Sequence, residues 1–265
     1  MKKYDPILTI AGCDPSGGAG IIADLKTIAT LKEYGMGVLT ILTAQNTLGV
    51  KNAQPVSVDF INEQLDAVLS DVMPSAIKIG MLRTQEIIAS VFKKLQEYKV
   101  KNIILDPVMV CSARRVLLDE AAIEEMKNSM HLADLVTPNL PEAEILSGVS
   151  SSKEEMAEKI LALGAKNVLI KGGRDEGEFC EDLLIYNGQK IINKNKKIDT
   201  KNIHGTGCTL SAAIATYVGK GLDIPEAYKA ARVYVQKAIE SGAEYQLGKG
   251  RGPVNHCVEA EPGIK

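Results

Sequence analysis

The chain has 265 residues, of which 45% are hydrophobic, and its formal net charge is -2 at pH 7. This length and composition suffice for one large α/β domain with a substantial core, and we expect a single domain over residues 1–265. The near-neutral charge, the lack of Trp and the lack of a polybasic tail speak against a nucleic-acid partner. No apolar stretch is long enough to span a bilayer, so we expect no membrane partner. Five cysteines without CxxC spacing favour reduced thiols and a cytoplasmic location.

The first predicted unit is a strand, a glycine-rich loop and a helix. Residues 7–12 form a short apolar run typical of a buried strand, and the loop 13–20 follows it. The loop has neither the Gly-Lys-Ser/Thr ending of a P-loop nor the GxGxxG spacing of a dinucleotide fingerprint. We therefore interpret its glycines as the lining of a small-molecule pocket. Asp24, one turn into the helix, either faces that pocket or is a solvated surface carboxylate.

A second apolar run, residues 38–44, predicts a buried strand that ends at Gln45 and Asn46. A side-chain amide at the carboxyl end of a strand suits recognition of a heteroaromatic ring, because it donates and accepts hydrogen bonds together. The alternative is that this Gln-Asn pair only forms a turn.

Strands and helices then alternate along the chain. Further apolar runs predict strands that begin at residues 76, 102, 135 and 168, and helical patterns cover 60–69, 85–98, 121–130, 153–163 and 224–241. This alternation indicates βαβ units and a mostly parallel sheet, in which ligands bind beyond the carboxyl ends of the strands. Residues 181–199 hold two more strands around Asn187-Gly188, which is a hairpin signal.

The stretch 202–214 begins as a turn with two glycines and becomes a helix near Cys208. Such a helix start binds anions, because its first N–H groups have no partner within the helix and carry partial positive charge. At this position the pKa of the Cys208 thiol is expected to be lowered, so that a thiolate is favoured. The alternative is a helix that is simply entered through a flexible turn.

Three charged residues follow separate predicted strands: Asp106, Glu142 and Lys171. Two carboxylates suit Mg²⁺, which keeps its waters and needs few protein ligands. A lysine and a helix N-terminus suit a phosphoryl group, whose transfer depends mainly on positioning and charge stabilisation. Each residue has an alternative interpretation as a solvated surface group. Their combination in one α/β domain favours a phosphoryl-transfer site.

The motifs resemble the hydroxymethylpyrimidine/phosphomethylpyrimidine kinases of the ribokinase-like superfamily, from about Ile7 to His256. The matching segments are residues 11–20, 23–27, 44–47, 78–81, 106–109, 137–142, 171–173, 204–209 and 248–254. The resemblance implies a single-domain, three-layer fold with helices on both faces of a central, mostly parallel sheet. It also implies a homodimer that uses ATP and Mg²⁺ in thiamin synthesis, phosphorylating 4-amino-5-hydroxymethyl-2-methylpyrimidine and then its monophosphate.

The resemblance assigns roles by position. Gln45 corresponds to the amide that recognises the pyrimidine, and Asp24 to a partner of the ring or its hydroxyl. Asp106 and Glu142 correspond to the Mg²⁺–phosphate shell. Gly12, Met81 and Val108 correspond to residues that line the substrate pocket. Asn139, Lys171 and Thr206 correspond to nucleotide contacts. The turn Gly205, Thr206 and Gly207 corresponds to the anion hole, and Cys208 to the catalytic cysteine.

The lid region departs from the family pattern. Residues 112–115 read Ser-Ala-Arg-Arg where the family often has Lys-Ser-Gly-Asp, and Cys111 precedes them as in some related pyridoxal kinases. Arg114 and Arg115 either supply phosphate charge or are solvated, and Cys111 either contacts pyridoxal or is an inert thiol. A pyridoxal kinase, or an enzyme of dual specificity, is therefore the alternative function. A catalytically silent binding protein on the same fold is the third.

Overall fold

The computed structural model describes residues 3–110, 118–172 and 177–258. They form one nine-stranded sheet in the order β3-β2-β1-β4-β5-β6-β7-β8-β9. The strands are β1 (Ile7–Cys13), β2 (Gly35–Asn46), β3 (Gly49–Pro55), β4 (Ala76–Ile79), β5 (Ile103–Leu105), β6 (Leu135–Val136), β7 (Val168–Ile170), β8 (Phe179–Tyr186) and β9 (Gln189–Lys196). The helices are α1 (Gly20–Thr30), α2 (Val58–Leu69), α3 (Gln85–Glu97), α4 (Glu120–Ser129), α5 (Leu140–Ser147), α6 (Lys153–Ala162), α7 (Thr206–Gly219) and α8 (Ile224–Ala243), with a 3-10 turn at Met130–Leu132.

The centre of the sheet is parallel and its edges are antiparallel. Strands β2, β1, β4, β5, β6 and β7 pair in parallel, whereas β3, β8 and β9 run antiparallel to their neighbours. The chain leaves β1 for β2 on one side and returns to β4 on the other side. In open α/β sheets, ligands bind beyond the carboxyl ends of the strands at such a reversal of strand order, which here lies between β1 and β4.

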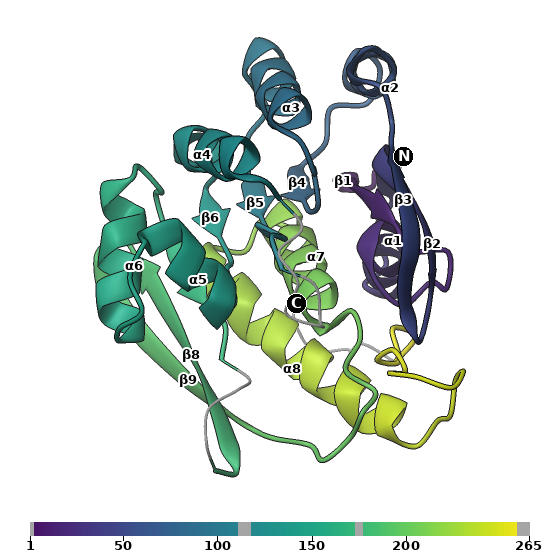
Figure 1. Ribbon diagram of the computed structural model, residues 1–265, viewed down its shortest axis with the longest axis vertical. Coiled ribbons are helices and arrows are strands. Elements are labelled where there is room, and N and C mark those ends of the chain that lie inside the picture. Colours follow the sequence, from purple (N-terminus) through teal and green to yellow (C-terminus); the bar gives the residue numbers. More distant parts are fainter. Residues whose placement is uncertain (1–2, 111–117, 173–176, 259–265) are drawn as a thin grey trace.

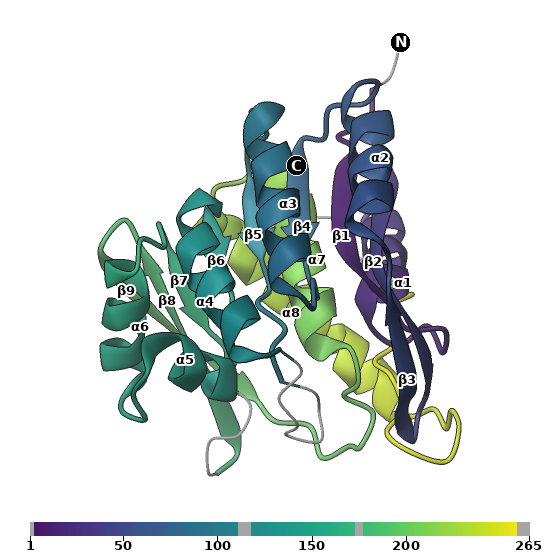
Figure 2. The same cartoon turned by 45° about the horizontal axis from the view of Figure 1, so that its top comes forward.

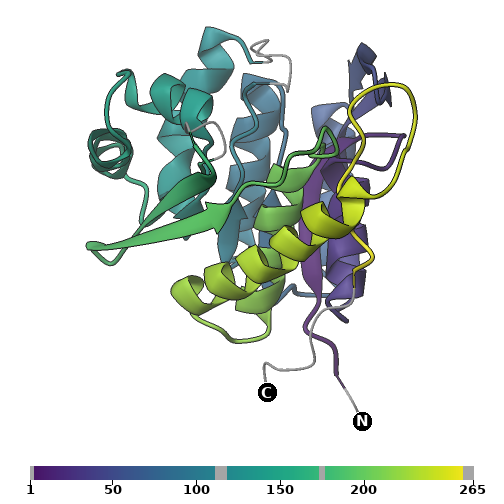
Figure 3. The same ribbon diagram turned by 90° about the horizontal axis from the view of Figure 1, so that it is seen from below.

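Helices cover both faces of the sheet (Figures 1 and 2). One buried core joins the sheet to α2–α6, and a second joins it to α1, α7 and α8. Strand β5 serves both cores, because Ile103 and Leu105 face the first while Ile104 faces the second. Figure 3 shows α8 crossing its face of the sheet beside α7. The expected three-layer α/β fold is therefore confirmed.

Two elements differ from the sequence-based expectation. Strand β2 does not end in a loop after Ala44; it runs to Asn46 and turns into the antiparallel strand β3. All residues of β3 are exposed, so the strand lacks the alternating apolar pattern by which it could have been predicted. The sequence pattern predicts a strand end through Glu142, but α5 already begins at Leu140. None of the helices in the described ranges has the length and apolar character to cross a membrane.

The segment after α8 returns to the tip of the β2–β3 hairpin (Figure 3). The backbone N–H groups of Gly250 and Arg251 donate to the hydroxyl and the carbonyl of Thr47, at 3.1 and 3.0 Å. The same segment pairs with the turn before α7, where Pro253 forms a bridge with His204. The C-terminal residues thus tie the hairpin to the start of α7.

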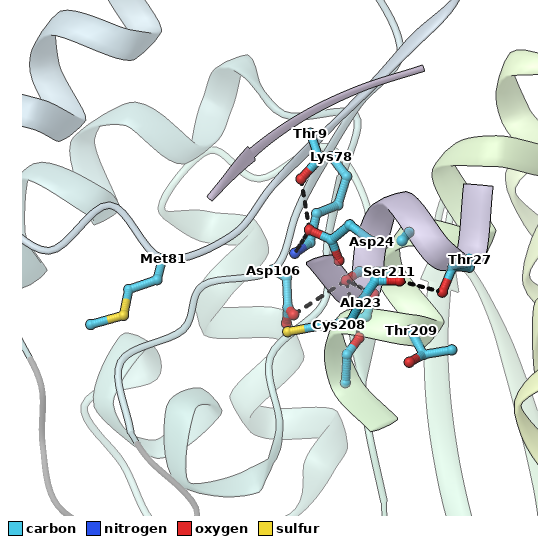
Figure 4. A network of polar contacts seen from close by, with 12 residues as sticks. Thr9, Ala23, Asp24, Thr27, Lys78, Met81, Asp106, Cys208, Thr209 and Ser211 are labelled. Atoms are coloured by element: carbon cyan, nitrogen blue, oxygen red, sulfur yellow. Dashed lines mark hydrogen bonds and ion pairs between the residues drawn. The ribbon is translucent and has the colours of Figure 1, made fainter. Parts of the chain in front are cut away.

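A buried ion pair joins three elements at the centre of the sheet (Figure 4). Lys78 of β4 donates from Nζ to Asp24 Oδ2 of α1 at 2.7 Å, and the Thr9 hydroxyl of β1 donates to the same oxygen at 2.6 Å. Both charged side chains are completely buried. Burial alone would lower the pKa of Lys78, but the negative charge of Asp24 outweighs it and holds that pKa above the usual range.

The solvated surface position considered for Asp24 is wrong, because its side chain is completely buried in this structure. The reason is that α1 packs its inner face against β1 and β2, where the carboxylate reaches and neutralises Lys78 of β4. Its assignment to the substrate ring or hydroxyl stays a prediction.

We expect Asp24→Ala to lower the free energy of unfolding by about 3–5 kcal/mol, because it leaves the ammonium of Lys78 buried without a counter-charge. The double variant Asp24→Leu/Lys78→Met removes both charges and should recover most of that loss. Glu97→Ala, which breaks a solvent-exposed pair with Lys93, is the matched control and should cost less than about 0.5 kcal/mol. Urea unfolding at neutral pH gives the free energy of unfolding of the single, double and control variants. A single variant no less stable than the double variant would contradict the assignment.

Candidate active site

The predicted convergence of charged residues is present at the carboxyl ends of the central strands. Lys171, which follows β7, donates from Nζ to Oδ1 of Asp106, which follows β5, at 2.7 Å. Both side chains are almost completely buried. The hydroxyl of Ser211 on α7 donates to Asp106 Oδ2 at 3.2 Å. Although burial would raise the pKa of Asp106, the positive charge of Lys171 holds it below the usual range.

Glu142 and Asn139 form the N-terminal cap of α5. The Asn139 side chain accepts from the Glu142 backbone at 3.1 Å, and the Glu142 carboxylate accepts from the Asn139 backbone at 2.9 Å. This is a capping box, and the spacing Asn-x-x-Glu with Pro141 inside it is the sequence signal by which α5 could have been predicted. Burial raises the pKa of Glu142 to about 7, against the lowering effect of Lys171.

The donor set around Asp106 fits a magnesium ion. One ammonium group, that of Lys171, serves two buried carboxylates, Asp106 and Glu142. Besides burial, the negative charge of Asp106 helps to raise the pKa of Glu142. A further cation would relieve this excess of negative charge, and Mg²⁺ binds with few carboxylates when waters and phosphate oxygens complete its shell. Within the described residues, no three His, Cys, Asp or Glu side chains gather closely enough to hold a metal by themselves.

The N-terminus of α7 points at the Asp106–Lys171 pair. Gly205 caps the helix with φ of 83°, and a Cβ there would collide with the carbonyl oxygen of Gly18. Gly207, the second residue of the helix, faces the ion pair: a Cβ built on it would lie 3.4 Å from Lys171 Nζ. Backbone N–H groups, a lysine and a carboxylate therefore meet at one place, as an anion site for phosphoryl transfer requires.

The expectation of a thiolate at Cys208 is wrong for this structure. Burial raises the pKa of the thiol to about 11, and the carboxylates Asp24 and Asp106 add to this effect while Lys78 opposes it. Figure 4 shows Cys208 beside Asp106 and below the Asp24–Lys78 pair. A helix N-terminus by itself favours a thiolate, but two carboxylates and the loss of hydration outweigh it here. The thiol is uncharged at neutral pH.

The residues expected to line the pocket occupy different environments. Gly12 is buried in β1, and a Cβ there would clash with the Ile41 side chain, so this glycine is needed for packing against β2. Met81 and Val108 are half-buried and follow β4 and β5. Figure 4 places Met81 apart from the charged network. Cys111, Arg114 and Arg115 lie outside the described residues.

The glycines of the β1–α1 loop also have a packing role. A Cβ on Gly18 would lie 2.5 Å from the His204 ring, and one on Gly205 would strike the Gly18 carbonyl. These glycines therefore allow the loop and the turn before α7 to touch. Their interpretation as the lining of a small-molecule pocket stays a prediction beside this contact between two loops.

Gln45 lies in a polar cluster that sequence reasoning missed. Its amide is 3.4 Å from Nε2 of His204, which is 2.8 Å from Oδ2 of Asp14. Burial would raise the pKa of Asp14, but hydrogen bonds from His204 and Ser16 hold it at about 2. Asp14 and Gln45 sit at the ends of neighbouring strands, whereas His204 is 190 residues beyond Asp14, so no local pattern in the sequence links them.

Comparison with known proteins identifies relatives over nearly the whole chain. Residues 14–255 match the phosphomethylpyrimidine kinase family. A hydroxymethylpyrimidine/phosphomethylpyrimidine kinase of Rhizobium meliloti is 43% identical over 256 residues, which are 94% of this chain and 96% of the relative. The thiamine biosynthesis bifunctional protein ThiED of Geobacter sulfurreducens is 45% identical over 96% of this chain, which spans about half (53%) of that longer relative.

A solved structure shares the fold. The pyridoxal kinase of Staphylococcus aureus, in complex with AMP-PCP and pyridoxal, superposes with a TM-score of 0.88 at 32% sequence identity, covering 97% of this chain and 94% of the other. It confirms the ribokinase-like architecture expected from the motifs. With the family match over residues 14–255 and 43% identity to a full-length relative, the chain belongs to the phosphomethylpyrimidine kinase family.

Proposed function

We propose that this protein is a kinase that uses ATP and Mg²⁺ to phosphorylate 4-amino-5-hydroxymethyl-2-methylpyrimidine and then its monophosphate, in thiamin biosynthesis. The observation that carries the proposal is the Lys171–Asp106 pair at 2.7 Å beneath Gly207 at the start of α7. The curated relative with 43% identity bears the name of this activity. We further propose a homodimer in the cytoplasm with small-molecule partners only, as the family resemblance implies.

Different groups of this chain have different roles in the proposed phosphoryl transfer. The backbone N–H groups of Thr206, Gly207 and Cys208 stabilise negative charge on the transferred phosphoryl group. Lys171 adds a positive charge at the same place, and its contact with Asp106 holds its ammonium toward Gly207. Asn139 caps α5 beside this centre and, with Lys171 and Thr206, is assigned to the nucleotide phosphates.

Asp106 and Glu142 would hold Mg²⁺, which supplies charge neutralisation between the phosphates when bound. The cysteine contributes less as a base, since a thiol with a pKa of about 11 is protonated at neutral pH. We therefore assign the larger catalytic share to the backbone donors of the α7 turn.

Pyrimidine recognition is assigned to Gln45, with Gly12, Met81 and Val108 around the ring. Gln45 is half-buried on β2, close enough to the α7 turn for its amide to approach His204. An amide there can donate to a ring nitrogen and accept from an amino group of the same ligand. Asp24 stays the proposed partner of the ring or its hydroxyl, and its carboxylate also accepts from Lys78 at 2.7 Å.

Pyridoxal phosphorylation is the second candidate. The observation in its favour is the S. aureus pyridoxal kinase, whose structure superposes with a TM-score of 0.88. Cys111 is the residue proposed to contact the pyridoxal aldehyde. The smaller identity to this kinase, 32% against 43% for the pyrimidine kinase relative, ranks the pyrimidine first.

Product analysis by mass spectrometry separates these functions. The protein is incubated with ATP, Mg²⁺ and, in separate reactions, the hydroxymethylpyrimidine, its monophosphate and pyridoxal. We expect mono- and diphosphate products from the pyrimidine series. Phosphorylation of pyridoxal alone would establish the second candidate, and no product from any substrate would favour the binding protein. Omission of Mg²⁺ with EDTA present should abolish the product.

Replacing Gln45 with Ala should raise the KM for the pyrimidine by a factor of roughly 5–150. This corresponds to about 1–3 kcal/mol, the cost of leaving the polar atoms of the bound ring without hydrogen-bond partners. The KM for ATP should change little. Gln54→Ala, which removes an exposed amide from the same hairpin, is the control and should change neither value. Steady-state kinetics with each substrate varied in turn measures both constants. Equal losses for the two substrates would refute the assignment of Gln45.

Cys208→Ala should leave measurable kinase activity, because it keeps the backbone donors of the turn. Gly207→Val should cost more, since its β-branched side chain would occupy the space between the turn and Lys171, where a Cβ already lies 3.4 Å from Nζ. The turnover number of each folded variant at saturating substrates is the measurement. If Cys208→Ala were inactive and Gly207→Val kept most of its activity, the larger catalytic share would belong to the cysteine and the proposal would be wrong.

A further inference from the structure

A buried acidic residue, Asp182 of β8, lies beside the end of β7. Its side chain is only 2% exposed. The Oδ1 atom of Asp182 accepts from the backbone N–H of Gly172 at 2.7 Å, and Gly172 directly follows Lys171. The carboxylate therefore contacts the backbone next to the lysine that the proposed function assigns to the phosphates.

The pairing of β7 with β8 stops where this contact begins. The last residue of β7 in the antiparallel ladder is Ile170. Lys171 then donates its N–H to the carbonyl of Pro138, which follows β6, at 2.9 Å. The next N–H, that of Gly172, faces β8 again and needs an acceptor there. The side chain of Asp182 supplies this acceptor in place of a backbone carbonyl.

These two hydrogen bonds fix the backbone on both sides of the Lys171 Cα atom. The N–H of Lys171 belongs to the peptide group before that atom, and the N–H of Gly172 belongs to the peptide group after it. Because each peptide group is planar, holding both of them sets the direction in which the lysine side chain leaves the backbone. From there its Nζ reaches Asp106 Oδ1 at 2.7 Å and lies 3.4 Å from the position of a Cβ on Gly207.

Two side chains of α8 hold the Asp182 carboxylate in turn. The Tyr228 hydroxyl donates to Oδ2 at 2.8 Å, and Arg232 Nε lies 3.3 Å from the same oxygen. Among the described residues Arg232 Nε has no hydrogen-bond partner, so it acts on Asp182 through its charge. Burial raises the pKa of Tyr228, which keeps its hydroxyl a donor. With Oδ2 occupied in this way, Oδ1 stays directed at Gly172.

The same two contacts keep Asp182 from competing for the lysine. Leu169 and Leu184 both belong to the core under α7 and α8. Lys171 is two residues after the first and Asp182 is two residues before the second, so both charged side chains face these helices. A second unpaired carboxylate on this face would draw the ammonium of Lys171 away from Asp106. The positive charge from α8 neutralises Asp182 and removes that competition.

We propose that Asp182 is a positioning residue for phosphoryl transfer: by accepting from Gly172 it fixes the end of β7 and holds the ammonium of Lys171 beside Asp106 and the first turn of α7. This inference rests on the proposed function, which assigns Lys171 to the phosphate groups. Asp182 is buried behind the backbone of the site and acts through Lys171.

Two substitutions separate the acceptor from the charge. Asp182→Asn and Asp182→Leu both remove the negative charge opposite Arg232, but Asp182→Asn keeps an oxygen for the N–H of Gly172. In Asp182→Leu we expect kcat for the pyrimidine to fall by about tenfold to a hundredfold, because a misplaced ammonium no longer matches the transferred phosphoryl group. Asp182→Asn should keep most of the parent kcat. The KM for the pyrimidine should not change in either variant, because Gln45 lies on β2, which four strands separate from β7.

Glu181→Gln is the matched control. Glu181 is the neighbouring carboxylate on β8, and it forms a solvent-exposed pair with Lys194 at 3.6 Å, so neither kcat nor KM should change. Equal losses of kcat in Asp182→Asn and Asp182→Leu would overturn the inference, because the charge and not the acceptor would then matter. If Asp182→Leu did not fold, a large loss of kcat in folded Asp182→Asn would overturn it in the same way, and a retained kcat would support it.

Binding of the ATP analogue AMP-PCP with Mg²⁺, measured by calorimetry, tests the link to Lys171 without turnover. Asp182→Leu should weaken binding in the parent protein but change it by less than about twofold in Lys171→Ala, since no ammonium is left to position. Equal losses in the two backgrounds would overturn the inference, because a merely structural role does not depend on Lys171. A parent protein that phosphorylates no pyrimidine would overturn the proposed function, and the binding measurement would still decide this inference.

Discussion

The close approach of two glycine-bearing turns is the constraint on which the site depends. Gly205 adopts φ of 83° at the start of α7, and its Cα lies against the carbonyl of Gly18, with no room for a Cβ on either side. This contact aims the N-terminus of α7 at Lys171 and Asp106 and places the His204 ring over Gly18. The same turn therefore faces Lys171 and Asp106 with its backbone and brings the His204 ring to 3.4 Å from the Gln45 amide.

The buried charges beneath this turn form two ion pairs, which act on each other and have different consequences. Lys78 and Asp24 neutralise each other inside the sheet and tie β4 to α1. Lys171 and Asp106 also pair, but Glu142 adds a second carboxylate that one ammonium cannot neutralise. Asp106, Glu142 and Lys171 together have an excess of negative charge at the carboxyl ends of the strands, which suits a divalent cation. Burial and these negative surroundings also keep the Cys208 thiol, with its pKa of about 11, protonated, so the fold limits the cysteine as a base.

Local patterns in the amino-acid sequence were enough to predict the parallel centre of the sheet, most helices, and the gathering of Asp106 and Lys171. Apolar periodicity identifies the strands, and parallel strands place their carboxyl ends at one edge of the sheet, which is why these predictions are confirmed. The glycine-bearing turn at the start of α7 was also predictable, since glycines before a helix start have a local signature.

Other properties of the site became visible only in the folded chain: the burial of Asp24, the raised pKa of Cys208 and the polar cluster of Asp14, His204 and Gln45. Each of them arises from neighbours that are dozens to almost two hundred residues away in the sequence. A pKa and a hydrogen-bond partner depend on the distance to those neighbours and on their shielding from water, and no local pattern encodes either quantity.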